Sequence, residues 1–131
     1  MKRVLIDTNA YSALMRGESH IADVLMDCDV VLVSPIVEGE LYDGFLGGSR
    51  NKENLAIFNR FLEKPKTVRV PVTYQTSEWF AEIKRMLRKK GAPIPINDVW
   101  IAASCMEHGA RLLTQDEYFK SVDGLLRIGE R

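Results

Sequence analysis

Short runs of β-branched and aliphatic residues alternate with longer stretches of helical periodicity, and this alternation restricts the fold more than any other feature. The predicted strands cover residues 3–6, 30–33, 67–70, 111–114 and 125–128. The predicted helices cover residues 10–15, 18–26, 35–46, 51–63, 73–90 and 97–107. Strands separated by helices form βαβ units, and therefore a parallel sheet with helices on both faces. The nearly all-apolar strands suit such a sheet, so we predict an α/β fold.

The 131 residues suffice for a single domain with its own core, and no Pro- or Gly-rich linker divides them. Hydrophobic residues make up 46% and charged residues 27%, as in an ordinary globular protein. The 18 basic and 18 acidic residues cancel. This neutral total disfavours tight non-specific binding of nucleic acid over the whole surface, but it permits binding through a local patch.

Cys28 and Cys105 are the only cysteines, and they form no CxxC motif. A disulfide framework and a zinc site are therefore disfavoured, and two thiols fit a reducing cytoplasm. The first residues lack the apolar stretch that a secretory signal or a membrane span requires. We expect a cytoplasmic protein with no membrane segment.

Three aspartates fall where predicted strands end or crossover helices begin. Asp7 directly follows the first strand, and Asp116 lies just past the fourth. Asp98 opens the last helix, for which Asn97 is the predicted N-cap. Ligands of open parallel sheets bind beyond the carboxyl ends of the strands. If the first and fourth strands are neighbours, Asp7 and Asp116 meet at this edge.

A fourth acid, Glu40, lies on the helix that Ser34 and Pro35 are predicted to start. On a helical wheel Glu40 falls within the apolar arc, whereas Glu38 lies at its edge. A carboxylate on an apolar face is costly unless it is paired or coordinated. The wheel therefore predicts that Glu40, rather than Glu38, points toward the other acids.

Each acid also has an ordinary structural explanation. Asp7 and Asp116 would cap the short helices that follow them, and Asp98 would favour a helix dipole. Glu40 would simply be solvated. Together the acids predict something different, because two carboxylates about 4 Å apart repel by roughly 4 kcal/mol at an effective dielectric of 20. No cluster of Lys or Arg stands beside them in the sequence, so protons or cations must offset the charge.

Oxygen ligands select Mg²⁺ or Mn²⁺ over zinc. A cation of this kind activates water for phosphodiester hydrolysis. Asn9, Asn97 and Thr114 stand close to the acids in the sequence, and we expect them to orient carboxylates or water. Generic surface polar residues would show the same pattern.

Four short motifs in this order resemble those of PIN-domain nucleases. They are Asp7-Thr8-Asn9, Glu40-Leu41, Asn97-Asp98 followed by Ile101-Ala102-Ala103, and Leu112-Leu113-Thr114 followed by Asp116. Within this family, the length and the motif order are similar to VapC-type toxins of toxin–antitoxin pairs, over residues 3–128. The resemblance implies a three-layer α/β/α PIN-like fold whose five-stranded parallel sheet has the order 3-2-1-4-5.

The resemblance also implies an endoribonuclease that depends on Mg²⁺ or Mn²⁺, the toxin of a type II toxin–antitoxin module. Its catalytic and metal-binding residues would be Asp7, Glu40, Asp98 and Asp116. Members commonly form homodimers and are held inactive by a VapB-type antitoxin, whose tail can obstruct the acidic pocket. The implied partners are thus an RNA substrate, a second copy of the chain and an antitoxin.

Two other functions stay open at this stage. A phosphatase or a phospho-accepting receiver domain would need paired acids after the first strand or a lysine after the last. The chain has Thr8-Asn9 at the first position and Gly129 at the second. A PIN-like module that only binds RNA or protein would have no need of the four acids.

A basic stretch near the end of the helix at residues 73–90 comprises Lys84, Arg85, Arg88, Lys89 and Lys90. It would suit an RNA backbone, but cations also favour a helix C-terminus, and we favour this simpler explanation. Several aromatic residues would suit stacking on bases, but at helical spacing such residues belong more often to the core. They are Tyr11, Trp79, Phe80 and Trp100.

Overall fold

The computed structural model describes residues 1–129 and contains a five-stranded sheet. Its strands are β1 (Arg3–Ile6), β2 (Val30–Val33), β3 (Thr67–Arg69), β4 (Arg111–Leu113) and β5 (Arg127–Ile128). Every pair of neighbours is parallel, in the order β3-β2-β1-β4-β5. The predicted α/β fold and strand order are confirmed. β1 is central, and Leu5 lies between Leu32 of β2 and Leu112 of β4.

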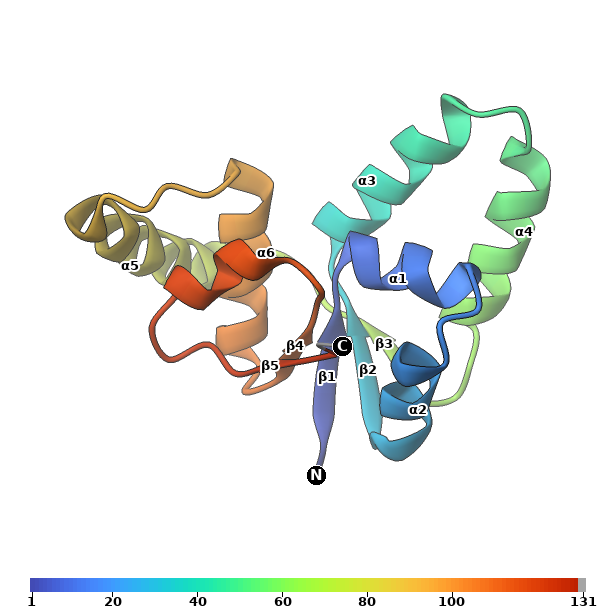
Figure 1. The fold of residues 1–131 in the computed structure, drawn as a ribbon, viewed down its shortest axis with the longest axis horizontal. Coiled ribbons are helices and arrows are strands. Elements are labelled where there is room, and N and C mark those ends of the chain that lie inside the picture. The colour runs from blue at the N-terminus through green and yellow to red at the C-terminus, as the bar shows by residue number, and fades with distance from the viewer. Residues whose placement is uncertain (130–131) are drawn as a thin grey trace.

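The helices lie on both faces of this sheet. They are α1 (Thr8–Met15), α2 (Ser19–Asp27), α3 (Pro35–Leu46), α4 (Asn51–Leu62), α5 (Tyr74–Lys90), α6 (Ile96–Glu107) and the short 3₁₀ helix η1 (Glu117–Ser121). Figure 1 shows α1 to α4 on one side of the strands and α5 and α6 on the other, which makes the predicted three layers. No helix within residues 1–129 is long and apolar enough to span a bilayer.

The strands and the inner helix faces supply the core. Leu5, Ile6, Leu112 and Leu113 are fully buried, as expected for strands covered on both faces. Residues 99 and 101–105 of α6 are buried as well, so this helix is held firmly against the sheet. The acid at its N-terminal end is therefore fixed relative to the strand ends.

The helix starts agree with the predictions to within one residue except at α1, and the predicted N-cap of α6 is not the observed one. Ser34 caps α3 as predicted, and its hydroxyl accepts a 3.3 Å hydrogen bond from the Val37 amide. α1 begins at Thr8, two residues earlier than predicted, because Asp7 serves as its N-cap. The predicted cap Asn97 is wrong. Pro95 occupies that position, and its carbonyl oxygen accepts the first backbone hydrogen bonds of α6.

Candidate active site

Asp7 stands at the junction of β1 and α1, and its two carboxylate oxygens differ in surroundings. Oδ1 accepts a 2.7 Å hydrogen bond from the Ala10 amide, which is the capping role that the sequence left open. Oδ2 is buried and lacks a well-aligned partner among residues 1–129. The side chain is almost wholly buried, so its charge has lost most of its solvation.

The pKa of Asp7 is raised to about 6, chiefly by burial and also by the charges of Asp116 and Asp98. The Thr114 hydroxyl and the Ala10 amide oppose this shift by hydrogen bonding to the carboxylate. Thr114 thus lowers the pKa of the first acid, and its role in orienting a carboxylate stays a prediction. A buried carboxyl with a neighbouring acid on each of two other elements is a feature of functional sites.

Asp116 reaches the same edge of the sheet from β4. The Asp116 amide donates a 3.0 Å hydrogen bond to the Thr114 hydroxyl, which shapes the turn after the strand. Asn9 on α1 donates a 2.8 Å hydrogen bond from Nδ2 to Asp116 Oδ2. Because β1 and β4 are neighbours, the segments after them lie close together. Asn9 therefore positions a carboxylate, as predicted.

Asp98, half-buried in the first turn of α6, completes the group of aspartates. Burial raises its pKa, and the charges of Glu40 and Asp116 act in the same direction. A hydrogen bond from the Tyr118 hydroxyl opposes this shift. The same hydroxyl lies 3.4 Å from Asp116 Oδ2, so Tyr118 lies between two of the acids. Tyr118 was not among the residues predicted from the sequence, although it stands only two residues after Asp116.

Glu40 approaches the aspartates from α3. The Thr8 hydroxyl donates a 2.6 Å hydrogen bond to Glu40 Oε1. Asn97 Nδ2 donates a longer one, 3.5 Å, to Oε2, so Asn97 orients a carboxylate as predicted. Thr8 was not predicted as a site residue. Its place between Asp7 and Asn9 in one of the motifs could have indicated this role. These contacts join α1, α3 and α6 around the acids.

The burial of Glu38 differs from the helical-wheel prediction. It is the more buried of the two glutamates, with 6% of its surface exposed, whereas the wheel placed it at the edge of the apolar arc. Arg69, the last residue of β3, donates a 3.0 Å hydrogen bond from Nε to Glu38 Oε2. Tyr42 adds a 3.2 Å hydrogen bond to Oε1. A local ion pair offsets this buried charge, so Glu38 is no part of the acid group.

The residues around Asp7 suit a divalent cation by their chemistry. Carboxylate oxygens are the ligands that Mg²⁺ and Mn²⁺ prefer, and Asp7 Oδ2 is a buried oxygen without a well-aligned partner. The charges of Glu40, Asp98 and Asp116 act on one another or on Asp7. In the described part of the chain, no three acid, His or Cys side chains are already arranged to hold an ion.

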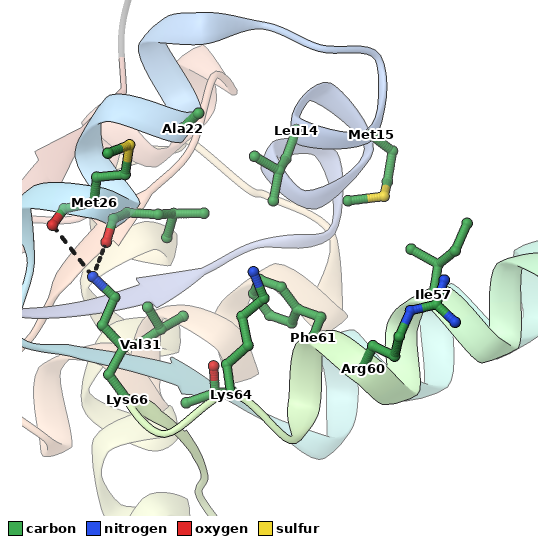
Figure 2. Close-up of a pocket in the computed structure, with 12 residues that line it drawn as sticks. Leu14, Met15, Ala22, Met26, Val31, Ile57, Arg60, Phe61, Lys64 and Lys66 are labelled. Atoms are coloured by element: carbon green, nitrogen blue, oxygen red, sulfur yellow. Dashed lines mark hydrogen bonds between the residues drawn. The ribbon is translucent and has the colours of Figure 1, made fainter.

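A hollow on another part of the surface lies away from the acids. It measures about 470 Å³ and opens between α1, α2 and α4, as Figure 2 shows. Its lining is mostly apolar, with Leu14, Met15 and Phe61 among the residues that face it, and Arg60 and Lys64 stand at its edge. It contains none of the predicted site residues.

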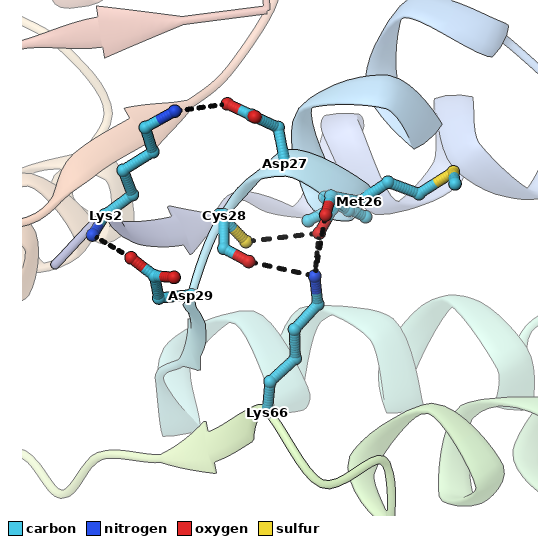
Figure 3. A network of polar contacts seen from close by, with 7 residues as sticks. Lys2, Met26, Asp27, Cys28, Asp29 and Lys66 are labelled. Carbon is cyan, nitrogen blue, oxygen red and sulfur yellow. Dashed lines mark hydrogen bonds and ion pairs between the residues drawn. The ribbon is translucent and has the colours of Figure 1, made fainter.

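Lys66 belongs to a structural contact rather than to a site. Its Nζ donates hydrogen bonds to the carbonyl oxygens of Leu25, Met26 and Cys28, at the end of α2 (Figure 3). A cation is favourable at a helix C-terminus, and this one ties α2 to the start of β3. Cys28 and Cys105 are both free and buried, in keeping with the absence of a disulfide framework that the sequence predicted.

The aromatic residues are partly in the core, as expected. Tyr11 is buried and makes edge-on contacts with Phe58 and Phe61. Phe80 and Trp100 stack on each other, with ring centroids 4.1 Å apart, between α5 and α6. These rings pack against one another, as is usual for aromatic residues of a core.

Comparisons with known proteins identify the family and the fold. Residues 4–125 match the PIN domain family. The chain is 30% identical to Ribonuclease VapC4 of Mycobacterium tuberculosis over 69% of each chain. It is 24% identical to Ribonuclease VapC5 of the same organism over 95% of this chain and 90% of the relative. The fold matches a chain of VapBC2 from Rickettsia felis, bound to a DNA fragment from their promoter. That match has a TM-score of 0.86 and 22% identity, and it covers 96% of this chain and 97% of the other.

Proposed function

This chain belongs to the PIN domain family, and we propose that it is an endoribonuclease that depends on Mg²⁺ or Mn²⁺. The observation that carries the proposal is the state of Asp7. This carboxylate is buried, has one oxygen without a well-aligned partner, and lies within the electrostatic influence of two further aspartates. The names of the two mycobacterial relatives, both ribonucleases, support the choice of RNA.

Asp7, Glu40, Asp98 and Asp116 would hold the cation. When bound, such a cation lowers the pKa of a water for attack on a phosphodiester and offsets the charge that develops on the leaving oxygen. The protein's own contribution is positioning. Asn9 holds Asp116 by a hydrogen bond of 2.8 Å, and Thr8 holds Glu40 by one of 2.6 Å. Burial of Asp7 keeps bulk water from competing for its oxygens.

We assign the chain the role of toxin in a type II toxin–antitoxin pair, with a VapB-type antitoxin as its partner and a homodimer as its assembly. The similarity to VapBC2 of Rickettsia felis and to the VapC relatives supports this part of the proposal. Two buried free thiols suit the reducing cytoplasm, where RNA is available. Co-expression with a neighbouring small reading frame, followed by co-purification, tests the partner.

The central test is cleavage of a mixed RNA by the purified chain with Mg²⁺, with Mn²⁺ and with EDTA. The proposal requires cleavage that EDTA abolishes and that either cation restores. Hydrolysis of p-nitrophenyl phosphate without RNA cleavage would indicate a phosphatase instead. RNA binding without cleavage under any of these conditions would indicate a silent PIN-like module. Both of these outcomes contradict the proposal.

A further inference from the structure

The basic stretch of α5 has little charge compensation in the folded protein. Within residues 1–129, no hydrogen bond or ion pair engages the side chains of Lys84, Arg85, Arg88 and Lys89. The chain as a whole has no excess of positive charge, so a local group of free cations is an exception. Such a group is the electrostatic feature that phosphate-bearing partners recognise.

The helix dipole explains only part of this group. Its effect is confined to the last turn of a helix, which in α5 contains Arg88, Lys89 and Lys90 before Gly91 ends the helix with a φ of 65°. Lys84 and Arg85 lie a full turn earlier and gain little from the dipole. The simpler explanation that the sequence favoured therefore leaves these two cations without a role.

Lys90 differs from its neighbours because its side chain makes a hydrogen bond and an ion pair. Its Nζ donates a 2.9 Å hydrogen bond to the Ser121 carbonyl oxygen and pairs with the Asp123 carboxylate. The Asp123 amide also lies 3.1 Å from the sulfur of Met86. These contacts tie the end of α5 to Ser121, the last residue of η1, and to Asp123 just beyond it. Asp116 directly precedes η1, so the basic group has a defined position relative to this acid.

A hollow of about 220 Å³ lies beside these cations. Lys84 and Arg88 line one side of it, and Pro93, Ile94 and Val99 line the other. Val99 directly follows Asp98 on α6, so the hollow adjoins the helix turn that carries one of the acids. Figure 1 shows α5 and α6 side by side, with the chain from 91 to 95 connecting them.

We propose that this surface, formed by Lys84 and Arg88 at the hollow and by Arg85 and Lys89 next to them in α5, binds the phosphate backbone of a single RNA strand and delivers it to the acids. The inference rests on the proposed nuclease function. Four acids repel a polyanion, so a nuclease of this kind needs cations outside the acid group to hold its substrate. The free cations next to α6 supply them. Phosphate contacts position a strand without selecting its sequence.

The test compares two matched pairs of substitutions. Lys84→Gln/Arg88→Gln removes the cations that line the hollow. Arg60→Gln/Lys64→Gln is the control, because it removes one Arg and one Lys with the same four-residue spacing, beside the larger hollow of Figure 2. Affinity for a fluorescein-labelled short single-stranded RNA of mixed sequence is measured by anisotropy in EDTA, over a range of salt concentrations. Circular dichroism confirms that both variants are folded.

The Lys84→Gln/Arg88→Gln variant, called the α5 pair below, should bind the RNA on the order of tenfold more weakly at low salt. The slope of log affinity against log salt concentration should become shallower by about 1.4, as expected for two lost phosphate contacts to a single strand. The control pair should leave both values close to wild type. The proposal would be overturned if the two variants lost RNA affinity equally, or if the salt dependence of RNA binding were unchanged in the α5 pair. So would an α5 pair that binds RNA normally but loses self-association in gel filtration, because the surface would then be a protein interface.

Binding in EDTA is independent of catalysis, so the two proposals can fail separately. RNA binding that depends on the α5 pair, without cleavage in Mg²⁺ or Mn²⁺, supports this surface and contradicts the nuclease. Cleavage by wild-type protein that the α5 pair leaves unchanged in rate and in KM contradicts the surface alone.

Discussion

Asn9 donates a hydrogen bond of 2.8 Å to Asp116 Oδ2, and this contact joins the segments that follow two neighbouring strands, β1 and β4. The two residues are more than a hundred positions apart in the chain. Their contact brings a carboxylate toward Asp7, which is already buried and coupled to Asp98. The electrostatic cost of this arrangement leads to the following predictions.

Added Mg²⁺ or Mn²⁺ should stabilise the wild-type protein, because a cation offsets the repulsion and binds the folded state only. Stabilisation reaches about 2.7 kcal/mol when the cation is at 100 times its Kd. Asp98→Asn should abolish most of the shift in Tm and reduce RNA cleavage by at least about 100-fold. Asp23→Asn changes an exposed carboxylate on α2, and this variant should keep both the Tm shift and the RNA cleavage of the wild type. Differential scanning fluorimetry and a gel-based cleavage assay measure the two effects, and a full Tm shift in Asp98→Asn would contradict the assignment.

Asp7→Asn should make the metal-free protein more stable at neutral pH while removing cleavage. The pKa of Asp7 is raised from 3.8 to about 6 in the folded state, so the folded state binds the proton more tightly than the unfolded chain. The shift therefore does not lower the unfolding free energy of the wild type below about pH 4. This free energy falls by up to about 3 kcal/mol as pH rises from about 4 through 6. The variant has no such loss.

Urea unfolding in EDTA from pH 4 to pH 7.5 checks this sign. The difference in unfolding free energy between Asp7→Asn and wild type should grow with pH and level off above 7, whereas Asp23→Asn should give no comparable trend. A difference that stays constant, or that shrinks as pH rises, would show that burial of Asp7 is not the dominant effect.

The two glutamates of α3 should respond in opposite ways to alanine. Glu40→Ala should lose RNA cleavage and keep its stability, because its partners Thr8 and Asn97 reach solvent. Glu38→Ala should keep cleavage and lose about 1–3 kcal/mol of stability, because Arg69 and Tyr42 lose their buried acceptor. Cleavage rates and urea unfolding of the two variants separate these roles. Loss of cleavage in a folded Glu38→Ala protein would count against the division.

Tyr118→Phe should weaken Mn²⁺ binding by about 10-fold while the ring and the fold stay in place. The hydroxyl donates a 3.4 Å hydrogen bond to Asp116 Oδ2 and lowers the pKa of Asp98, so its removal frees two carboxylates to turn away from each other. Tyr42→Phe is the matched control, because it removes a phenol that donates to Glu38 outside the acid group. Isothermal titration calorimetry with Mn²⁺ measures both. The same affinity in Tyr118→Phe and wild type would mean that the hydroxyl has no positioning role.

Much of the candidate site could be predicted because it depends on local patterns. Apolar periodicity located the strands, and the ends of parallel strands are where polar side chains collect. Asp7 and Asp116 were found for this reason. The strand order came from the family resemblance rather than from the residues, since alternation of strands and helices does not say which strands are neighbours. The assignment of the four acids to catalysis is still a prediction.

The sequence by itself determined the α/β class, the placement of acids after β1 and β4, and the start of α3 at Ser34, because each follows from residue type and short-range spacing. Only the tertiary structure decided which acid meets which partner. A helical wheel reports the face of a residue but not what lies opposite, so it missed the pairing of Glu38 with Arg69, 31 residues away. For the same reason the positions of Tyr118 and of the basic hollow beside α6 became visible only once the chain was folded.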